Sequence, residues 1–373
     1  MIYFDNAATT FPKPSTVTDE VHRCISAYCG NPGRGAHPLA MRAAEKIYEC
    51  REALAAFFDA GEPERVIFTL NTTHALNIAI KGLIPPGAHV LISELEHNAV
   101  FRPLVRLGGE RGVRVETFPV VGLTESEILS GIRARLCKDT AAIVCQHASN
   151  ICPIVLPIRE IGALCRGKGL FFVVDAAQSA GRLPLSVREC GISALALPGH
   201  KSLYGIQGCG ALILGEGILP TPLTEGGSGV DSLSPTMPEA PPERYEAGTL
   251  STPAIAGLLE GLEFLRETGM GEIEACEKRL YTALSERLTA LPGIRVYLPE
   301  TPGAVLLFNK EGVPAATVGE RLAARGICVR AGLHCAPLAH KALGTGEGGA
   351  VRVSFGAFNT VREVDALWRA LKD

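Results

Sequence analysis

The sequence lacks a hydrophobic run of the roughly 20 residues that a membrane-spanning helix needs. Its first ten residues, MIYFDNAATT, have neither a basic cluster nor an apolar core, which predicts a cytoplasmic protein without a secretory signal. It also lacks an excess of positive charge, because 36 Lys and Arg stand against 39 Asp and Glu. We therefore expect neither a nucleic acid nor a membrane as partner.

Paired cysteines are also missing, although the sequence has twelve cysteines. No two are spaced as C-x-x-C, and they occur singly in apolar segments such as AAIVCQHA and RGICVRAG. This scatter argues against a bound metal, a reactive dithiol and a non-catalytic carrier of sulfur or metal, since these use cysteines in pairs. We expect most of the thiols to be small buried side chains in a reducing compartment.

Short apolar runs alternate with helical patterns along most of the chain. Hydrophobic residues make up 47% and charged residues 20% of the 373, the balance of a globular enzyme. The helical spacing over residues 38–60 is an example of the connecting segments. This alternation predicts an α/β fold with a large, doubly wound and mostly parallel sheet. The runs are almost continuously apolar, as in strands covered on both faces: RVIFTL, HVLISEL, AAIVCQ, LFFVVD, SALALP and GALILG.

Two connections depart from this alternation. The turn that joins SALALP to GALILG is too short for a crossover helix, so we expect one antiparallel strand in the sheet. Residues 219–253 are rich in Pro, Gly and Ser and have no periodicity, which predicts a long functional loop.

A smaller C-terminal α/β domain is predicted beyond this loop. Amphipathic helices over 254–268 and 273–291 precede the strand candidates IRVYL, AVLLFN, ICVRAG and AVRVSFG and a final helix. We therefore expect an N-terminal arm, a large domain and a small domain, over residues 1–14, 15–253 and 254–373.

Several chemically active side chains follow the predicted strands. Lys201 lies between two buried runs, where desolvation lowers the pKa of an amine towards the neutral nucleophile. Asp175 ends LFFVVD and is followed by Gln178, and His97 follows HVLISEL. Each residue alone has an ordinary structural explanation, such as a helix cap or a buried histidine.

A phosphate site is predicted at another strand end. Thr72 and Thr73 open a helix, where backbone N–H groups and hydroxyls suit an anion, although a simple N-cap explains them as well. Pyridoxal 5′-phosphate needs four groups in its binding site: a lysine that forms a Schiff base, a carboxylate beside the ring nitrogen, a phosphate site and a flat side chain against the ring. We therefore expect this cofactor.

The motifs, taken in order, resemble the cysteine desulfurase and selenocysteine lyase family of the class V aminotransferase fold. The resemblance runs nearly from end to end and implies fold type I of pyridoxal-phosphate enzymes. It is carried by YFDNAATT, NPGRGAH, TTHALN, EHNAV, Ser149–Asn150, DAAQ, GHKSLYG, YEAGT, RAGLHC and VRVSFGAFNT.

The resemblance assigns a role to each matching residue. Lys201 would be the Schiff-base lysine, and Asp175 would pair with the pyridine nitrogen. Gln178 would contact the 3′-oxygen of the cofactor, and His97 would stack on its ring and act as a catalytic residue. Asn150 would lie beside both cofactor and substrate.

The phosphate and the substrate are assigned in the same way. Thr73 and His200 would bind the phosphate, with Thr72 adjacent. Thr249 would reach this phosphate from the neighbouring subunit of a homodimer. Arg352 would clamp the substrate carboxylate, for which the fork of a guanidinium is suited.

Cys335 matches the nucleophile that accepts sulfur in this family. Its neighbours His334 and Arg330 are expected to favour the reactive anion of its sulfur. The surrounding segment is short, which resembles the branch that also contains selenocysteine lyases. Two positions depart from the family pattern: Pro198 replaces a hydroxyl residue that contacts the phosphate, and His74 replaces a glutamate.

These assignments predict a homodimeric enzyme that converts L-cysteine to L-alanine and leaves a persulfide on Cys335. A sulfur-acceptor protein would be its further partner. Selenocysteine lyase is the nearest alternative, with L-selenocysteine as substrate, and a β-lyase or aminotransferase that does not use Cys335 is the next.

Overall fold

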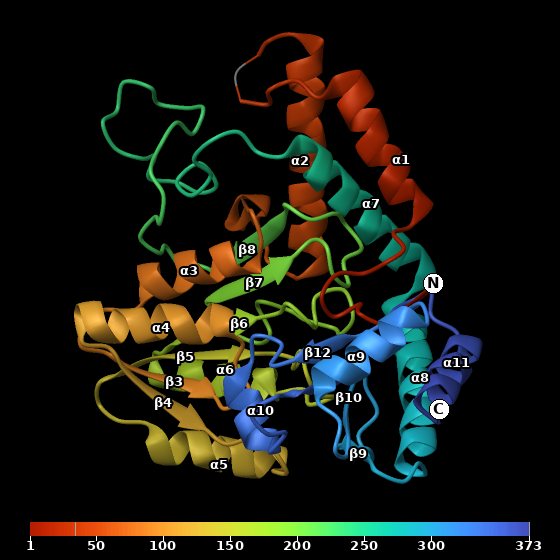
Figure 1. Cartoon of the computed structure of the whole chain (residues 1–373). Coiled ribbons are helices and arrows are strands. Elements are labelled where there is room, and N and C mark those ends of the chain that lie inside the picture. The colour runs from red at the N-terminus through yellow and green to blue at the C-terminus, as the bar shows by residue number, and fades with distance from the viewer. Residues whose placement is uncertain (34, 373) are drawn as a thin grey trace.

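The computed structural model describes residues 1–33 and 35–372, so Arg34 of the NPGRGAH motif lies outside the described residues. The chain forms a large sheet covered by helices on both faces and a smaller sheet that lies beside it (Figure 1). None of the helices within the described ranges combines the length and the apolar character of a membrane span.

The large sheet has seven strands, and all of its pairings are parallel except those of β8. β8 runs antiparallel to both of its neighbours, and its connection from β7, over residues 199–209, contains no crossover helix. The predicted mostly parallel sheet with one antiparallel strand is therefore confirmed. The strands in spatial order are β2 Val66–Thr69, β8 Gly210–Leu214, β7 Ala194–Pro198, β6 Phe171–Asp175, β5 Thr140–Gln146, β3 His89–Ser93 and β4 Arg114–Phe118.

Alternate residues of the large sheet pack against different helices. Ile67 of β2 shares a core with α3 (Thr72–Leu83) and α4 (Asn98–Arg111), whereas Phe68 shares another core with α2 (Pro38–Phe57). The second core also receives α5 (Glu125–Arg135), α6 (Ile158–Lys168) and α7 (Thr252–Thr268). Figure 1 shows α3 and α4 on one side of the sheet and α5 and α6 on the other. Burial on both faces explains why the strand sequences are almost continuously apolar.

The smaller sheet is antiparallel and is formed by strands from the C-terminal part of the chain. Its order is β12 (Arg330–Gly332), β13 (Ala350–Ser354), β10 (Val305–Lys310) and β9 (Ile294–Tyr297). The remaining helices are α1 Ser15–Arg23, the π-helix η1 Cys24–Tyr28, the 3₁₀-helix η2 Pro63–Arg65, α8 Met270–Thr289, α9 Ala315–Ala324, α10 Pro337–Leu343 and α11 Val361–Lys372.

The N-terminal arm crosses to the C-terminal part of the fold. β1 (Ile2–Tyr3) pairs in parallel with β11 (Ile327–Cys328), and Phe4 is fully buried in the core of the smaller sheet. ICVRAG, predicted as one strand, is divided between β11 and β12, which belong to different sheets. The three-part division of the chain stays a prediction, and α7 packs in the core of the large sheet.

Two glycines of α6 provide a test of this packing. A Cβ at Gly162 would lie 1.6 Å from the carbonyl oxygen of Cys190, whereas a Cβ at Gly167 would have nothing within 4 Å. Gly162→Ala should therefore lower the free energy of unfolding by about 3 kcal/mol. Gly167→Ala, the matched control in the same helix, should raise it by about 0.5 kcal/mol. Urea unfolding of both variants measures this, and equal effects would contradict the described packing of α6.

Candidate active site

The carboxyl ends of the parallel strands converge on one cavity of about 110 Å³. Gln146 at the end of β5 pairs with Asp175 at the end of β6, and Asp175 pairs with Ala196 near the end of β7. Ligands bind at this edge in open α/β sheets. The cavity is lined by Asn71, Thr72, Thr73, His97, Ala99, Gln146, Ala148, Asn150, Asp175, Ala177, Gln178, Pro198, His200 and Lys201. It thus brings together eight of the residues assigned to the cofactor from the sequence, from five different segments of the chain.

Lys201 borders the cavity, and the surrounding protein removes most of the water from its amine. Burial lowers the pKa of Lys201 to about 8, and the nearby Arg352 and Arg330 act in the same direction. Asp175 raises this pKa and is the main opposing influence. A substantial part of the amine is therefore neutral near physiological pH, as a nucleophile or a base requires.

Asp175 is buried, and desolvation raises the pKa of its carboxyl group. The backbone N–H of Ala177 donates to Oδ1 at 2.9 Å, and both this hydrogen bond and Lys201 lower the pKa. A buried carboxyl in this position can hold a proton on a pyridine nitrogen, because the pair would share one charge-assisted hydrogen bond.

The start of α3 forms a site suited to a phosphate. Asn71 caps the helix by accepting the backbone N–H of His74 at 3.0 Å, and Thr72 and Thr73 are its first two residues. Helix N-termini attract anions through their free N–H groups and the helix dipole. Sequence reasoning missed Asn71, although an Asn before a helical pattern is an N-cap signal.

Unsatisfied polar atoms in the cavity are chemically suited to pyridoxal 5′-phosphate. Oγ1 of Thr72, Nδ1 of His200 and Oδ1 of Asn150 are buried and have no hydrogen-bond partner among the described residues. Leaving such groups unpaired is costly unless a ligand or water satisfies them. A hydroxyl and an imidazole near the N-terminus of α3 suit a phosphate, so the residues present fit the cofactor.

His97 and His200 contribute neutral rings. Burial and, to a smaller extent, the charge of Lys201 lower the pKa of each imidazole to about 4. Nδ1 of His97 accepts the backbone N–H of Ala99 at 3.0 Å, which fixes the ring at the start of α4. An uncharged, fixed and flat ring is suited to stacking on an aromatic cofactor.

The N-terminal arm fixes the segment that carries Lys201. Nζ of Lys13 donates to the carbonyl oxygen of His200 at 2.7 Å, and Oγ1 of Thr9 donates to the same oxygen at 3.0 Å. Oγ1 of Thr10 donates to the carbonyl oxygen of Lys201 at 3.0 Å. Sequence reasoning gave no role to Lys13, because nothing local indicates a contact almost 190 residues away.

Arg352 comes from β13 and is 2% exposed. Nη1 donates to the carbonyl oxygen of Asn150 at 3.0 Å, and Nη2 donates to Oδ1 of Asp5 at 2.6 Å. Nε is buried and has no partner among the described residues. The guanidinium is thus held in place while its Nε–H and other N–H donors stay free, and Asp5 is a site residue that sequence reasoning missed.

Cys335 is exposed and lies between β12 and α10. His334 and Cys335 have φ of 49° and 55°, in the left-handed region that non-glycine residues rarely adopt. Nδ2 of Asn150 donates to the carbonyl oxygen of His334 at 2.9 Å, and the backbone N–H of Asn98 donates to that of Cys335 at 2.7 Å. These bonds hold a strained segment in place, as is common at functional sites.

The expectation that His334 favours the anionic sulfur of Cys335 is wrong. Its Nδ1 lies 3.0 Å from Nε2 of His340, and its Nε2 lies 3.1 Å from the carbonyl oxygen of Arg330, so neither nitrogen is left for the thiol. Burial lowers the pKa of His334 to about 3, and the ring is therefore neutral. A chain from His334 through His340 to Thr345 supports the backbone of this segment instead.

The two departures from the family pattern both lie beside the phosphate site. Pro198 lines the cavity, where it offers no hydroxyl. His74 accepts the backbone N–H of Leu70 through Nδ1 at 3.3 Å, and burial lowers the pKa of its ring. A neutral imidazole thus accepts a backbone N–H at the start of α3, where a glutamate would place a negative charge.

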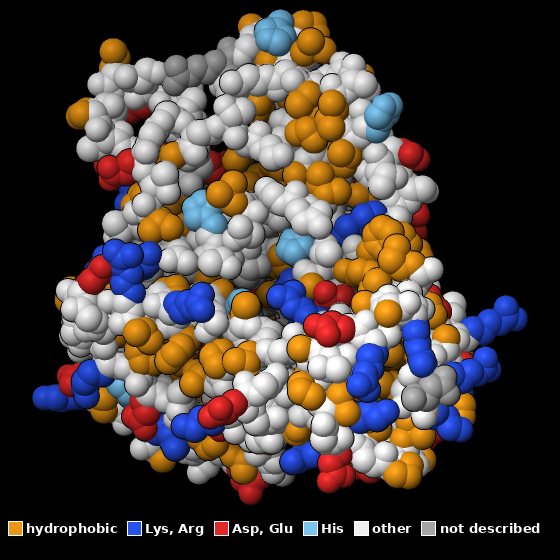
Figure 2. All heavy atoms as spheres, in the orientation of Figure 1, with side chains coloured by type: hydrophobic (Ala, Val, Ile, Leu, Met, Phe, Trp, Pro, Cys, Tyr) orange, Lys and Arg blue, Asp and Glu red, His pale blue; other side chains and the backbone are white. Residues whose placement is uncertain are grey.

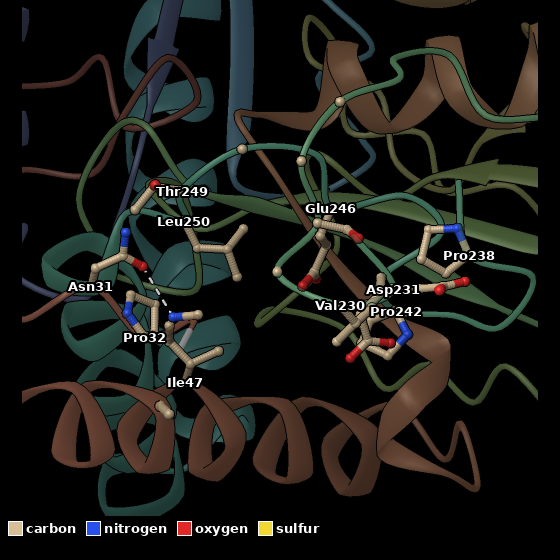
Figure 3. A pocket seen from close by; sticks show the side chains of 18 of the residues that line it. Asn31, Pro32, Ile47, Val230, Asp231, Pro238, Pro242, Glu246, Thr249 and Leu250 are labelled. Carbon is tan, nitrogen blue, oxygen red and sulfur yellow. Dashed lines mark hydrogen bonds between the residues drawn. The ribbon is translucent and has the colours of Figure 1, made fainter. Parts of the chain in front are cut away.

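Thr249 does not line the cavity of Lys201. It borders a separate cleft of about 1060 Å³ between α2 and the loop that precedes α7. Figure 3 shows Thr249 and Leu250 facing Asn31 and Pro32 across this cleft, with Glu246 further along the same loop. A bidentate ion pair between Glu246 and Arg51 of α2, with both distances 2.9 Å, fixes the loop.

Comparison with known proteins agrees with this geometry. The chain matches the class V aminotransferase family over residues 2–367 and belongs to that family. A probable cysteine desulfurase of Methanothermobacter thermautotrophicus is 34% identical over 382 residues, which cover 100% of this chain and 94% of the relative. One of Mycolicibacterium paratuberculosis is 33% identical, and the match covers 100% of this chain but 55% of that longer protein.

A solved structure shows the same fold. The apo cysteine desulfurase of Thermococcus onnurineus NA1 has a TM-score of 0.92 and 31% identity, covering 100% of this chain and 94% of that one. The resemblance to cysteine desulfurases and the fold type I architecture expected from the sequence motifs are therefore confirmed.

The electrostatics of Lys201 predict a pH dependence. In cofactor-free protein, labelling of Lys201 by trinitrobenzenesulfonate should rise with pH about a midpoint near 8, because the reagent takes the neutral amine. Asp175→Asn removes the carboxylate that raises this pKa, so the labelling curve should move to lower pH. Asp139→Asn, at the opposite edge of the sheet, should leave it in place. Peptide mass mapping follows the label, and a curve that moves upward in Asp175→Asn would contradict the assigned electrostatics.

Proposed function

We propose that the protein is a pyridoxal-phosphate-dependent cysteine desulfurase that converts L-cysteine to L-alanine and takes the sulfur onto Cys335. The observation that carries this function is the single cavity that joins Lys201, Asp175 and the start of α3, with unsatisfied polar atoms on Thr72 and His200. The cysteine desulfurases among its full-length relatives support the choice of substrate.

The roles of the cofactor-binding residues follow from their positions. Bound pyridoxal 5′-phosphate would supply an aldehyde for the substrate amine and a ring that takes up electrons from the α-carbon. Thr72, Thr73 and His200 would hold the phosphate at the N-terminus of α3. Asp175 would keep the ring nitrogen protonated, and His97 would lie flat against the ring.

The remaining residues act on the substrate. Asn150 and Gln178 line the same cavity as Asp175, where they would orient cofactor and substrate. Arg352 would bind the substrate carboxylate through the donors that Asp5 and Asn150 leave free. Lys201, which is close to neutrality, would remove the α-proton and return it to carbon. Cys335 would attack the substrate sulfur, so that the S–C bond breaks and a persulfide remains on the enzyme.

A homodimer with shared sites is part of the proposal. The family resemblance places Thr249 in the phosphate site of the neighbouring subunit, and Thr249 here borders a cleft away from its own Lys201. Apolar side chains gather over α1 and α2 beside this cleft (Figure 2). Exposed examples are Ile25, Leu39, Met41 and Tyr48, which suit a contact with a second copy. We also propose that the enzyme works in the cytoplasm, supported by its free thiols, and passes sulfur to an acceptor protein.

Replacement of the nucleophile tests the proposed reaction. Cys335→Ala should bind pyridoxal 5′-phosphate as the wild type does, because Cys335 does not line the cavity. Its production of alanine from cysteine should fall at least about 100-fold, since no thiolate is left to take the sulfur.

Cys29→Ala, at another exposed cysteine, is the matched control and should keep its activity within about twofold. Alanine and enzyme-bound persulfide are measured with cysteine and with selenocysteine. Full activity of Cys335→Ala on cysteine would contradict the mechanism, and full activity on selenocysteine alone would identify a selenocysteine lyase.

Subunit mixing tests the shared sites. Lys201→Ala lacks the amine, and Thr249→Asp places a negative charge that repels the phosphate, so each homodimer should be inactive. In a mixed dimer, one site has both native residues, and coexpression in equal amounts should restore about one quarter of the wild-type activity. Absence of any recovery would show that each site is contained within one subunit.

A further inference from the structure

A second nucleophilic cluster lies near the amino ends of the parallel strands, whereas Lys201 lies near their carboxyl ends. Cys137 is in the turn between α5 and β5, His89 is the first residue of β3, and Glu116 is in the edge strand β4 (Figure 1). β5 runs from Thr140, beside this cluster, to Gln146, which lines the Lys201 cavity. About 20 Å of strand therefore separates the two places.

The side chain of His89 lies between those of Cys137 and Glu116 and contacts both. Sγ of Cys137 lies 3.5 Å from Nδ1 of His89, and Nε2 of His89 lies 3.3 Å from Oε2 of Glu116. Cys137 is exposed, whereas the side chain of His89 is 5% exposed. A thiol, an imidazole and a carboxylate in this order activate a nucleophile, because the imidazole takes the proton and the carboxylate stabilises the resulting cation.

Thr140 holds the sulfur and the ring together. Its hydroxyl lies 3.5 Å from Sγ of Cys137 and 2.9 Å from Nδ1 of His89, and it accepts the backbone N–H of Cys137 at 2.9 Å. The hydrogen bond from Thr140 lowers the pKa of the Cys137 thiol, and the backbone N–H of Asp139 and the charge of Arg114 lower it further. Burial instead raises the pKa of the core thiols Cys24, Cys50, Cys145, Cys152, Cys165, Cys190 and Cys209.

Charged groups from each neighbouring element surround the cluster. Arg114 of β4 pairs with Asp139 at 2.9 Å, and Arg135 of α5 pairs with Glu116 at 3.3 Å. Lys138 is exposed next to Cys137. Glu116 keeps a second oxygen directed at His89, and the cations near the sulfur favour the approach of an anionic reactant.

We propose that Cys137 is a reactive thiol at which this protein forms mixed disulfides with small-molecule disulfides. The Cys137 thiolate attacks one sulfur of the disulfide, a new S–S bond forms, the original S–S bond breaks, and one thiolate leaves with the electron pair. The proton that His89 accepted from Cys137 passes to the leaving thiolate. The sulfur of Cys137 is oxidised and one half of the small molecule is reduced, so no other oxidant is needed.

Glutathione disulfide is the probe that tests this site. Cofactor-loaded protein is incubated with it at pH 7, and peptide mass mapping follows the mixed disulfide at each cysteine separately. Cys137 should react about tenfold faster than Cys29, the exposed cysteine that serves as internal control. Equal rates at Cys137 and Cys29 would overturn the proposal.

Variants of the neighbouring residues show whether Cys137 reacts because His89 activates its thiol or only because it is exposed to the reagent. His89→Gln cannot take the thiol proton, so the reaction of Cys137 should slow about tenfold at pH 7 and recover above about pH 8.5, where thiols ionise unaided. Glu116→Gln should slow it less. Glu125→Gln, at the far end of α5, is the matched control and should have no effect. A His89→Gln variant with an unchanged pH profile, or one that stays slow at high pH, would overturn the role of His89.

Discussion

Desolvation of the Lys201 amine is the constraint on which the rest of the site depends. A hydrated amine with an ordinary pKa would be a cation at neutral pH and could act neither as a nucleophile nor as a base. Burial and two arginines lower the pKa of Lys201, while Asp175 raises it, and the balance leaves it at about 8. The same low-dielectric surroundings keep His97 and His200 neutral, so that they offer surface and hydrogen bonds without adding charge.

Such an environment can be built only where several segments meet. The parallel strands bring Asp175 and Lys201 to one edge of the sheet, and the start of α3 adds free N–H groups that suit an anion. The N-terminal arm contacts both the segment of Lys201 and the smaller sheet: Lys13 donates to the carbonyl oxygen of His200, and Asp5 accepts from Arg352. The arm thereby links the large sheet to the smaller one. Cys335 follows β12, a strand of this smaller sheet. One connected set of contacts thus positions Lys201, Arg352 and the segment of Cys335.

The parts of this arrangement that could be predicted from the sequence have local signals. Doubly buried strands are continuously apolar, and motifs after strand ends mark the cavity residues. β4 was missed because RVETF is an exposed edge strand with a mixed pattern. The contacts of Lys13 and Asp5 were missed because they join residues far apart in sequence. The role expected of His334 was wrong because His340 and Arg330 occupy its ring nitrogens, which only the fold of that segment decides. The cluster around Cys137 has no motif at all and depends on how β3, β4 and the turn before β5 lie beside one another.

Borohydride reduction of the protein loaded with pyridoxal 5′-phosphate, followed by peptide mass mapping, tests the central claim most directly. The account predicts that the cofactor becomes covalently fixed to Lys201. Lys13 is the informative rival, because burial lowers its pKa to about 8 as well and it contacts the carbonyl oxygen of His200. Label on Lys13 or on any other lysine, or protein that takes up no cofactor, would contradict the account.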